Sequence, residues 1–324
     1  MTAPTLTLVT GSTGTVGSAI VTELLARGRA VRCLVRDPSR LAARHGVELF
    51  KGDLTNQASI REALAGVSHV FHAGGIPEQW VADPSIFMRI NRDGTKAMVD
   101  AALAEGVSSF VYTSTQDIFD LTANPFDERM PGHEPLLSDY ERSKQAADLV
   151  VETAVEKGLP ACFLHPAAVF GPGADKVVGL TGLLDRLLKS EVPVLLRGGL
   201  PVVFNRDLAK AHLLAEEKAA PGAHYILFDS YQTLQDIARA VEAVAPAVKR
   251  PATMPNWVAD LIAGVGGMLA GITGKRPLVS HGELGVLRRT GRPSSAKART
   301  ELGWTTTDFA NGVAETIAWL KERN

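Results

Sequence analysis

The sequence predicts an α/β protein with a doubly wound parallel sheet and a smaller, mostly helical C-terminal part. Through residue 165, short apolar runs rich in β-branched residues alternate with segments of helical spacing. This alternation is typical of βαβ units, whose parallel sheet is covered by helices on both faces. A glycine-rich turn separates the first apolar run from the first helical segment. After Pro166 the alternation stops, and from residue 233 the chain is mostly helical.

The expected elements follow one another along the chain. Strands are expected within 5–10, 30–35, 47–54, 69–75, 108–115 and 160–166, and helices within 19–28, 57–66, 90–106 and 138–150. Later come a helix within 171–190, a strand and a helix within 201–219, a strand within 223–229, and helices within 233–244 and 309–324. We therefore place one domain at 1–165, expect about 202–230 to return to its sheet, and assign most of 166–324 to a second part.

Composition excludes several classes of protein. The chain has 324 residues, of which 45% are hydrophobic, enough for a large core. Its net charge of -1 gives no reason to expect nucleic acid or an anionic membrane as the main partner. Cys33 and Cys162 lie alone in apolar runs, so we expect buried, reduced thiols and neither a disulfide framework nor a metal site. The N-terminus lacks a signal-peptide pattern, and we expect a cytoplasmic protein.

The glycine-rich turn has the spacing of a phosphate-binding loop. Residues 10–17 read T-G-S-T-G-T-V-G, directly between the first expected strand and helix. Glycine allows a tight turn and lets a pyrophosphate approach backbone N–H groups, while the helix N-terminus faces its charge. A glycine turn without a ligand is the alternative. The predicted dinucleotide contacts here are Gly11, Thr13, Gly14, Thr15, Val16 and Gly17.

The end of the second strand indicates which dinucleotide binds. Val35 stands where NAD-binding proteins carry an acid, and Arg36 and Arg40 follow. A guanidinium suits a 2′-phosphate through forked, charge-assisted bonds. Asp37 is a competing acid, but the proline after it indicates that it caps the next helix. The sequence thus favours NADP(H), with NAD(H) as the alternative.

Other contacts with the cofactor are expected at later strand ends. G-D-L at 52–54 places Asp53 near the adenine, and H-A-G-G at 72–75 lets backbone approach the ribose and phosphates. For His72 we favour a strand-end role over a catalytic one. The proline turn within 164–173 closes the nicotinamide side. The contacts predicted outside the glycine loop and Arg36 are Asp53, Leu54, Ala73, Gly74, Gly75, Thr113, Tyr140, Lys144, His165, Pro166 and Val169.

Tyr140 and Lys144 are four residues apart on an expected helix and so share one face. They form either a solvated surface pair or a general acid and the cation that tunes it. Hydride transfer to a ketone builds an alkoxide that needs a proton, which a tyrosine can give. Its usual pKa is about 10, and a nearby ammonium lowers it. A hydroxyl from the strand end at Ser114 or Thr115 can hydrogen-bond the substrate oxygen.

These motifs resemble those of the extended short-chain dehydrogenase/reductases, most of all the 3β-hydroxysteroid dehydrogenase and dihydroflavonol-reductase branches. The matching motifs are T-G-x-x-G-x-x-G at 10–17, G-D-L at 52–54, N-x-x-G-T at 91–95, Y-T-S-T at 112–115, Y-x-x-x-K at 140–144 and H-P-x-x-V-F-G-P-G at 165–173. Segments 205–212 and 294–304 extend the match to almost the whole chain. The resemblance implies a Rossmann-type fold in which 1–165 binds the dinucleotide and 166–324 mainly binds the substrate.

The resemblance also implies roles for single residues. Tyr140 corresponds to the general acid/base and Lys144 to its partner. The Ser/Thr of the family falls on Thr115, with Ser114 as the alternative. Asn91 corresponds to an asparagine that orders the site, either directly or by orienting the backbone.

One departure from the family pattern is His165–Pro166, where relatives usually have Arg-Pro. His165 is either a packing substitution or a group that titrates near neutral pH.

The same core serves reductases, alcohol dehydrogenases, sugar-nucleotide epimerases and dehydratases, so the substrate must come from other residues. Sugar-nucleotide enzymes of the family commonly carry an Arg-Asp-aromatic stretch, and the aromatic pair is missing from 197–212. We expect an NADP(H)-dependent oxidoreductase that interconverts a ketone and a secondary alcohol on an apolar, steroid-like or long-chain β-keto/β-hydroxy compound. The alternatives are a sugar-nucleotide epimerase/dehydratase with tightly bound NAD(P) and, more remotely, a non-catalytic dinucleotide sensor.

Two helical segments bear on partners. Segment 257–273 contains Asp260 and four glycines, and its uncharged run is shorter than the roughly 20 residues of a membrane span. We expect a helix that packs in the core, lines an apolar substrate pocket or touches a membrane surface. Its large apolar residues are Trp257, Leu261, Ile262, Met268, Leu269 and Ile272. The resemblance implies a homodimer through helices near 84–104 and 138–157, and the apolar stripe of the second (Ala147, Val150, Val151, Ala154 and Val155) suits either a dimer or the core.

Overall fold

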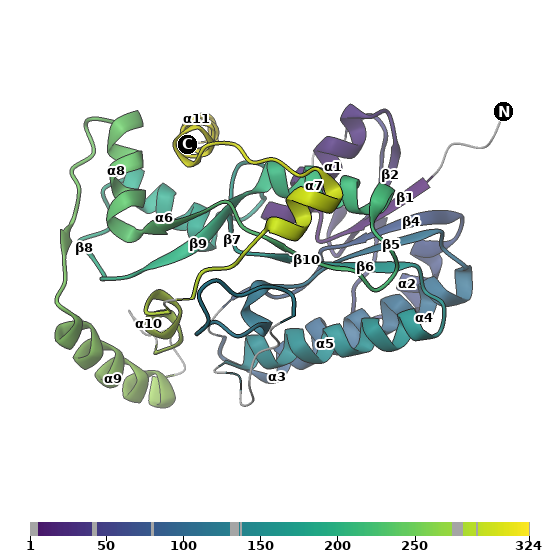
Figure 1. Ribbon diagram of the computed structural model, residues 1–324, viewed down its shortest axis with the longest axis horizontal. Helices are drawn as coiled ribbons and strands as arrows, with labels where there is room; N and C mark the ends of the chain where they lie inside the picture. Colours follow the sequence, from purple (N-terminus) through teal and green to yellow (C-terminus); the bar gives the residue numbers. More distant parts are fainter. Residues whose placement is uncertain are drawn as a thin grey trace.

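A computed structural model describes residues 6–40, 44–78, 81–129, 136, 138–273, 281–289 and 291–323. At its centre lies a seven-stranded sheet in the order β10-β6-β5-β4-β1-β2-β3, with every pairing parallel (Figure 1). The strands are β1 (Leu6–Thr10), β2 (Ala30–Val35), β3 (Val47–Lys51), β4 (Val67–His72), β5 (Ser109–Thr113), β6 (Ala161–Pro166) and β10 (His224–Leu227). The chain runs from β1 to one edge and then from β4 to the other, which confirms the predicted doubly wound fold.

Helices cover both faces of this sheet. On one face α1 packs against α7, and on the other α2 packs against α4 and α4 against α5 (Figure 1). Their bounds are α1 (Thr15–Ala26), α2 (Gln57–Leu64), α4 (Thr95–Glu105), α5 (Asp139–Glu156) and α7 (Asn205–Lys218). Separate apolar clusters fill the two interfaces. Burial on both faces explains why the strands read as continuous apolar runs in the sequence.

The rest of the chain forms a smaller part beside the carboxyl ends of the large sheet. Strands β11 (Ser230–Thr233), β9 (Gly199–Phe204) and β7 (Ala168–Phe170) form a three-stranded sheet, and β8 (Val194–Leu195) pairs with β12 (Ala252–Thr253). Helices α6 (Gly179–Leu188), α8 (Leu234–Val244) and α11 (Phe309–Arg323) pack together around a third apolar cluster. Between these segments the chain enters the large sheet once more, because β10 pairs with β6.

Helix α9 (Asn256–Thr273) differs from the core-packing alternative. Trp257 is 70% exposed, and Leu261, Val265 and Leu269 are also exposed. Ala259 and Ala263 instead face a small apolar cluster with Leu284 of α10 (His281–Leu287). Ile262 also packs against this cluster. The inner side of the helix is thus held by Ala259, Ala263 and Ile262, and four other large residues line its outer face. The side chains of Met268 and Ile272 lie outside the described residues. No helix in the described part of the chain is long and apolar enough to cross a membrane.

The structure also shows where the α5 stripe and the two cysteines lie, and where the helix expected at 90–106 begins. The stripe on α5 lies in the core of its own chain, with Ala147, Val151 and Ala154 buried and Val150 and Val155 packed against them. Both cysteines are buried and free, as predicted. The expected helix at 90–106 begins earlier, as α3 (Ser85–Phe87) followed by a π-helical segment (Met88–Gly94) before α4.

Candidate functional site

The loop between β1 and α1 forms a cradle that only glycine can line. Gly11 has a φ of +70°, and a Cβ there would lie 2.5 Å from the backbone oxygen of Ala73. A Cβ on Gly17 would lie 2.3 Å from the oxygen of Gly11. Helix α1 starts without a side-chain cap at Gly14 and without an acid in its first turn. An uncapped, acid-free helix start beneath a glycine loop fits a pyrophosphate.

The carboxyl ends of β2 and β3 meet where the sequence places the adenosine. Arg36 is exposed directly after β2. Burial acts to raise the pKa of Asp53, but hydrogen bonds from Thr55 and the charge of Arg36 outweigh it and lower the pKa. Asp37 accepts hydrogen bonds from the backbone and hydroxyl of Ser39 at 3.1 and 2.6 Å, which matches its predicted capping role. Arg36 is thus the cation beside this end, and the side chain of Arg40 lies outside the described residues.

His72 is a structural residue at the end of β4. Its Nδ1 lies 2.8 Å from the Thr10 hydroxyl, and its Nε2 lies 3.0 Å from the Thr95 hydroxyl. Burial lowers the pKa of this imidazole to about 3, so it is neutral. The Thr10 hydroxyl also accepts a hydrogen bond from the N–H of Gly74 at 2.9 Å. The histidine therefore anchors the turn at Ala73 and Gly74 that closes over Gly11.

Helix α5 presents Tyr140 and Lys144 one turn apart at its N-terminal end. A capping box between Ser138 and Glu141 fixes the start of the helix. The Lys144 ammonium is buried and donates to the Tyr112 hydroxyl at 2.9 Å and to the backbone oxygen of Thr113 at 2.8 Å. Burial lowers the pKa of Lys144, and Asp148 acts against that shift. Lys144 is thus held against the end of β5 rather than in solvent, which excludes the surface-pair reading.

The pKa of Tyr140 is raised above its usual value, first by burial and then by the charge of Asp117. A hydrogen bond with the Thr115 hydroxyl acts in the opposite direction. The expected fall in this pKa is not found, because burial and the charge of Asp117 raise it, while the Lys144 ammonium donates to Tyr112 and Thr113. A tyrosine in this state keeps its proton.

The two hydroxyls at the end of β5 point to different partners. Ser114 donates to the Asp148 carboxylate at 2.6 Å. Thr115 accepts from the N–H of Asp117 at 3.2 Å, and its hydroxyl acts to lower the pKa of Tyr140. Of the two candidates, Thr115 is the one that the structure brings together with Tyr140.

Asn91 lies in the π-helical segment and is buried. Its side chain accepts from the N–H of Ile76 at 2.8 Å and donates to the Ser143 hydroxyl at 2.9 Å. Ser143 in turn donates to the backbone oxygen of Tyr140 at 2.7 Å. Asn91 therefore joins the loop after β4 to the turn of α5 that carries Tyr140, as expected of a residue that orients the backbone. π-helical segments often occur at functional sites.

The proline turn contributes mainly backbone. The side chain of His165 is fully buried and lies against Phe119, Phe163 and His224, so a ligand can meet it only through the backbone. Pro166 is buried, and Val169 is partly buried. The Thr113 hydroxyl is bound to His212 at 2.8 Å.

Sequence reasoning missed a link from the C-terminal part to the catalytic helix. Arg289 forms an ion pair with Glu141, the buried neighbour of Tyr140, and lies 3.4 Å from Asp117. Burial raises the pKa of Asp117, while the charge of Arg289 opposes the shift. No local motif marks Arg289, because its partners are more than 140 residues away.

Replacing Arg289 with glutamine is expected to lower the free energy of unfolding by about 3 kcal/mol, because it leaves the buried acids without their cation. The matched control is Arg288→Gln, which breaks an exposed pair with Asp260 and should cost at most about 1 kcal/mol. Urea unfolding of both variants measures the difference. Equal losses would show that the Arg289 pair is no stronger than a surface pair.

Comparisons with known proteins agree with this geometry. The model of the NAD dependent epimerase/dehydratase family matches residues 7–228. The chain is 29% identical to sterol demethylase protein B of Methylococcus capsulatus, with 98% of each chain covered. It is 31% identical to the 3 beta-hydroxysteroid dehydrogenase/Delta 5-->4-isomerase of Mycobacterium tuberculosis over 69% of this chain and 64% of that protein. The crystal structure of gox2253 superimposes with a TM-score of 0.85 at 32% identity, covering 98% of each chain.

Proposed function

The chain belongs to the NAD dependent epimerase/dehydratase family, the extended short-chain dehydrogenase/reductases, and from this premise we propose that it is an NADP(H)-dependent oxidoreductase that interconverts a ketone and a secondary alcohol. The observation that carries the proposal is the placement of three groups at the end of β5: Lys144 donates to the backbone oxygen of Thr113, and the Thr115 hydroxyl acts on the pKa of Tyr140. Open α/β sheets bind ligands at this edge.

Each side chain has a task in ketone reduction. The nicotinamide, when bound, supplies the hydride. Tyr140 gives its proton to the substrate oxygen, and a raised pKa keeps that proton available. The Thr115 hydroxyl bonds the same oxygen and fixes its place. The Lys144 ammonium stabilises the phenolate that remains, once the substrate oxygen has taken the proton.

An apolar substrate is supported by three observations. The named relatives include a sterol demethylase protein and a hydroxysteroid dehydrogenase. The aromatic pair common in sugar-nucleotide enzymes is missing from 197–212. Helix α9 carries exposed Trp257, Leu261 and Leu269, a surface that a steroid-like or long-chain molecule can contact. Contact of this face with a membrane surface, and a homodimer, stay predictions.

The test is oxidation of NADPH followed at 340 nm with a panel of steroid and long-chain β-keto ketones. Net oxidation with at least one of them is expected. An epimerase recycles its bound cofactor, so product formed from a sugar nucleotide with no net oxidation would replace the proposal with that alternative. Failure of NADP and NAD to raise the thermal midpoint would contradict both readings.

Arg36 is expected to carry the preference for NADP. The change Arg36→Ala should raise the KM for NADPH about 10- to 100-fold, the value of one lost hydrogen bond to a charged group, and leave the KM for NADH nearly unchanged. Lys96→Ala removes another exposed cation, on α4, and serves as the control. A similar rise for both dinucleotides would place Arg36 away from the 2′-phosphate.

A further inference from the structure

We propose that Asp148, His165 and His224 form a proton path that connects Lys144 to a surface pocket on the far side of β6. The inference rests on the proposed function, because only a proton-consuming reaction at Tyr140 gives the path a use. Nothing in the family motifs marks this route, which depends on the two histidines that this chain carries at positions 165 and 224.

The inner arm runs from Lys144 to Asp148. The ammonium donates to the Tyr112 hydroxyl at 2.9 Å, and both Lys144 and the Tyr112 hydroxyl act to lower the pKa of Asp148. Ser114 donates to Asp148 Oδ1 at 2.6 Å. Asp148 is 2% exposed, and its Oδ2 has no hydrogen-bond partner among the described residues. A buried carboxylate with one unused oxygen is poised to accept a proton.

The outer arm runs from Asp148 to His224. His165 Nδ1 lies 3.2 Å from the backbone oxygen of Thr115 and 3.8 Å from the free Oδ2 of Asp148. A carbonyl can only accept, so Nδ1 of His165 carries the hydrogen and its Nε2 is the acceptor. That Nε2 lies 2.9 Å from His224 Nδ1, which must therefore donate. His224 thus donates to His165, and His165 donates to the Thr115 backbone oxygen, with the Oδ2 of Asp148 3.8 Å from the same nitrogen.

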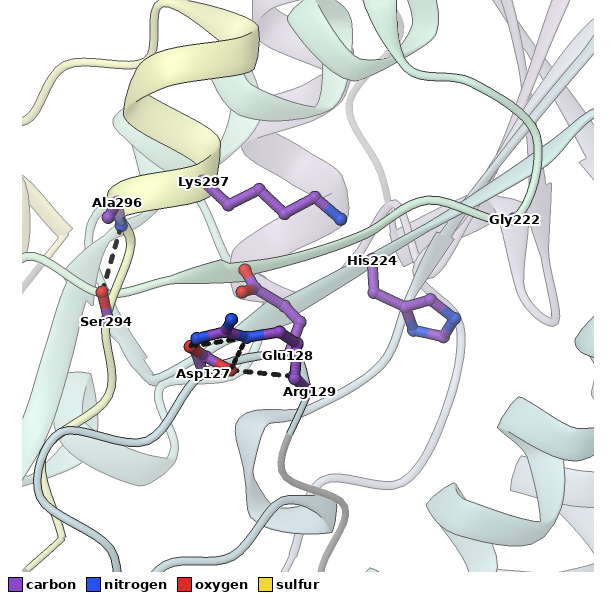
Figure 2. A pocket seen from close by; sticks show the side chains of 8 residues that line it. All are labelled: Asp127, Glu128, Arg129, Gly222, His224, Ser294, Ala296 and Lys297. Carbon is purple, nitrogen blue, oxygen red and sulfur yellow. Dashed lines mark hydrogen bonds and ion pairs between the residues drawn. The ribbon is translucent and has the colours of Figure 1, made fainter.

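His224 opens the path to solvent. It is one of the residues that line a pocket of about 370 Å³, together with Glu128 and Lys297 (Figure 2). Its Nε2 lies 3.8 Å from the exposed carboxylate of Glu152. The imidazole side chain is 25% exposed, whereas that of His165 is fully buried. Of these two stacked rings, as the described residues surround them, His224 is the one that meets solvent, so protons enter there.

The charged groups around the path determine which of its members hold a proton. Burial and the charges of His224, Lys144 and Lys297 lower the pKa of His165, against a hydrogen bond to the Thr115 backbone, and both histidines rest neutral. Burial raises the pKa of Asp148 and lowers that of Lys144, so that the two pKa values come closer together. A proton that enters is thus passed on by the histidines and held between Asp148 and Lys144.

The protons balance over one reduction. The O–H bond of Tyr140 breaks as the O–H bond of the alcohol forms, and Lys144 returns one proton to the phenolate. The Tyr112 hydroxyl passes a proton to the Lys144 amine and takes one from the Asp148 carboxyl. Asp148 regains a proton from His165 Nδ1, His165 gains one at Nε2 from His224 Nδ1, and His224 gains one at Nε2 from solvent. Both rings are then the opposite tautomers, and the starting tautomers return when a proton moves outward. One proton leaves solvent per hydride transferred, and alcohol oxidation runs the path in reverse.

The same three side chains have atoms of metal-binding type within 4.8 Å of one another. A cation would have to break the bonds of His165 to Thr115 and to His224. It would also face the ammonium groups of Lys144 and Lys297, which already act on His165. We therefore assign the cluster to protons.

The first experiment needs no turnover. In protein labelled with 15N-histidine, exchange of the buried His165 Nδ1 hydrogen with water is measured by NMR in the wild type and in His224→Ala. Exchange at least about tenfold slower in the variant is expected, because the solvent-facing imidazole next to His165 is lost. The control is His69→Ala, a histidine on β4 with the same 25% side-chain exposure and its own glutamate partner, Glu216. Unchanged exchange in His224→Ala, or an equal change in the control, would overturn the path.

The second experiment follows turnover with the ketone that NADPH reduces fastest. The change His224→Ala should lower kcat about tenfold with KM unchanged, less than the loss of a direct proton donor, and free imidazole should restore it. Loss of activity with EDTA in the wild type would overturn the assignment in favour of a metal. Slowed exchange with no ketone reduced would uphold the path and refute the proposed function.

Discussion

The change Tyr140→Phe is expected to lower kcat for ketone reduction about 10²- to 10⁴-fold, the usual contribution of a positioned general acid. Phenylalanine keeps the ring and its edge contact with Phe87 but has no proton to give. Buried Thr115 also loses its hydroxyl partner. Steady-state assays with NADPH measure kcat, and a fluorescence titration measures the Kd of the dinucleotide, which should change far less.

Tyr231→Phe is the matched control, because it removes the same atom from a tyrosine on β11, in the smaller sheet. It should leave kcat within a factor of about two. If Tyr140→Phe turned over as fast as the wild type, Tyr140 would not be the acid, and the mechanism proposed above would be wrong.

The change Gly17→Ala is expected to lower dinucleotide affinity about 10²-fold and the free energy of unfolding by about 1–3 kcal/mol. The added Cβ would lie 2.3 Å from the oxygen of Gly11 and 2.8 Å from the nitrogen of Ser12. Both are backbone atoms, so α1 must move away from the loop that holds the phosphates. Isothermal titration with NADPH and urea unfolding measure the two losses separately.

The control for this change is Gly28→Ala. Gly28 also has a φ of +70°, yet a Cβ there meets nothing within 4 Å. Alanine should therefore strain the backbone and lower stability by about 1 kcal/mol without weakening the binding of NADPH. Equal loss of affinity in both variants would mean that Gly17→Ala acts through stability alone.

The sequence could be read well wherever a local pattern determines structure. The strand expected at 30–35 is β2 with the same bounds, and the helix expected at 57–66 contains α2. Buried parallel strands need continuous apolar residues, and the glycine loop needs its glycines for steric reasons. The pairing of Tyr140 and Lys144 on one helical face follows from helix geometry alone.

Expectations failed where neighbours distant in the chain decide the outcome. The exposed outer face of α9 reverses the core-packing alternative, since its apolar spacing reveals a face but not what covers it. The raised pKa of Tyr140 depends on Asp117, 23 positions earlier, and on burial that only the fold creates.

Local patterns in the sequence predicted the succession of strands and helices along the chain, the dinucleotide loop, and Tyr140, Lys144 and Thr115 as candidate site residues. The contacts between distant segments could be seen only in the folded chain. They are Lys144 with Tyr112, Glu141 with Arg289, and His165 with His224. The reason is the distance along the chain over which each kind of interaction acts. Backbone periodicity and turn sterics act over a few residues and are written in local patterns, whereas burial and charge act through space between segments that only folding brings together.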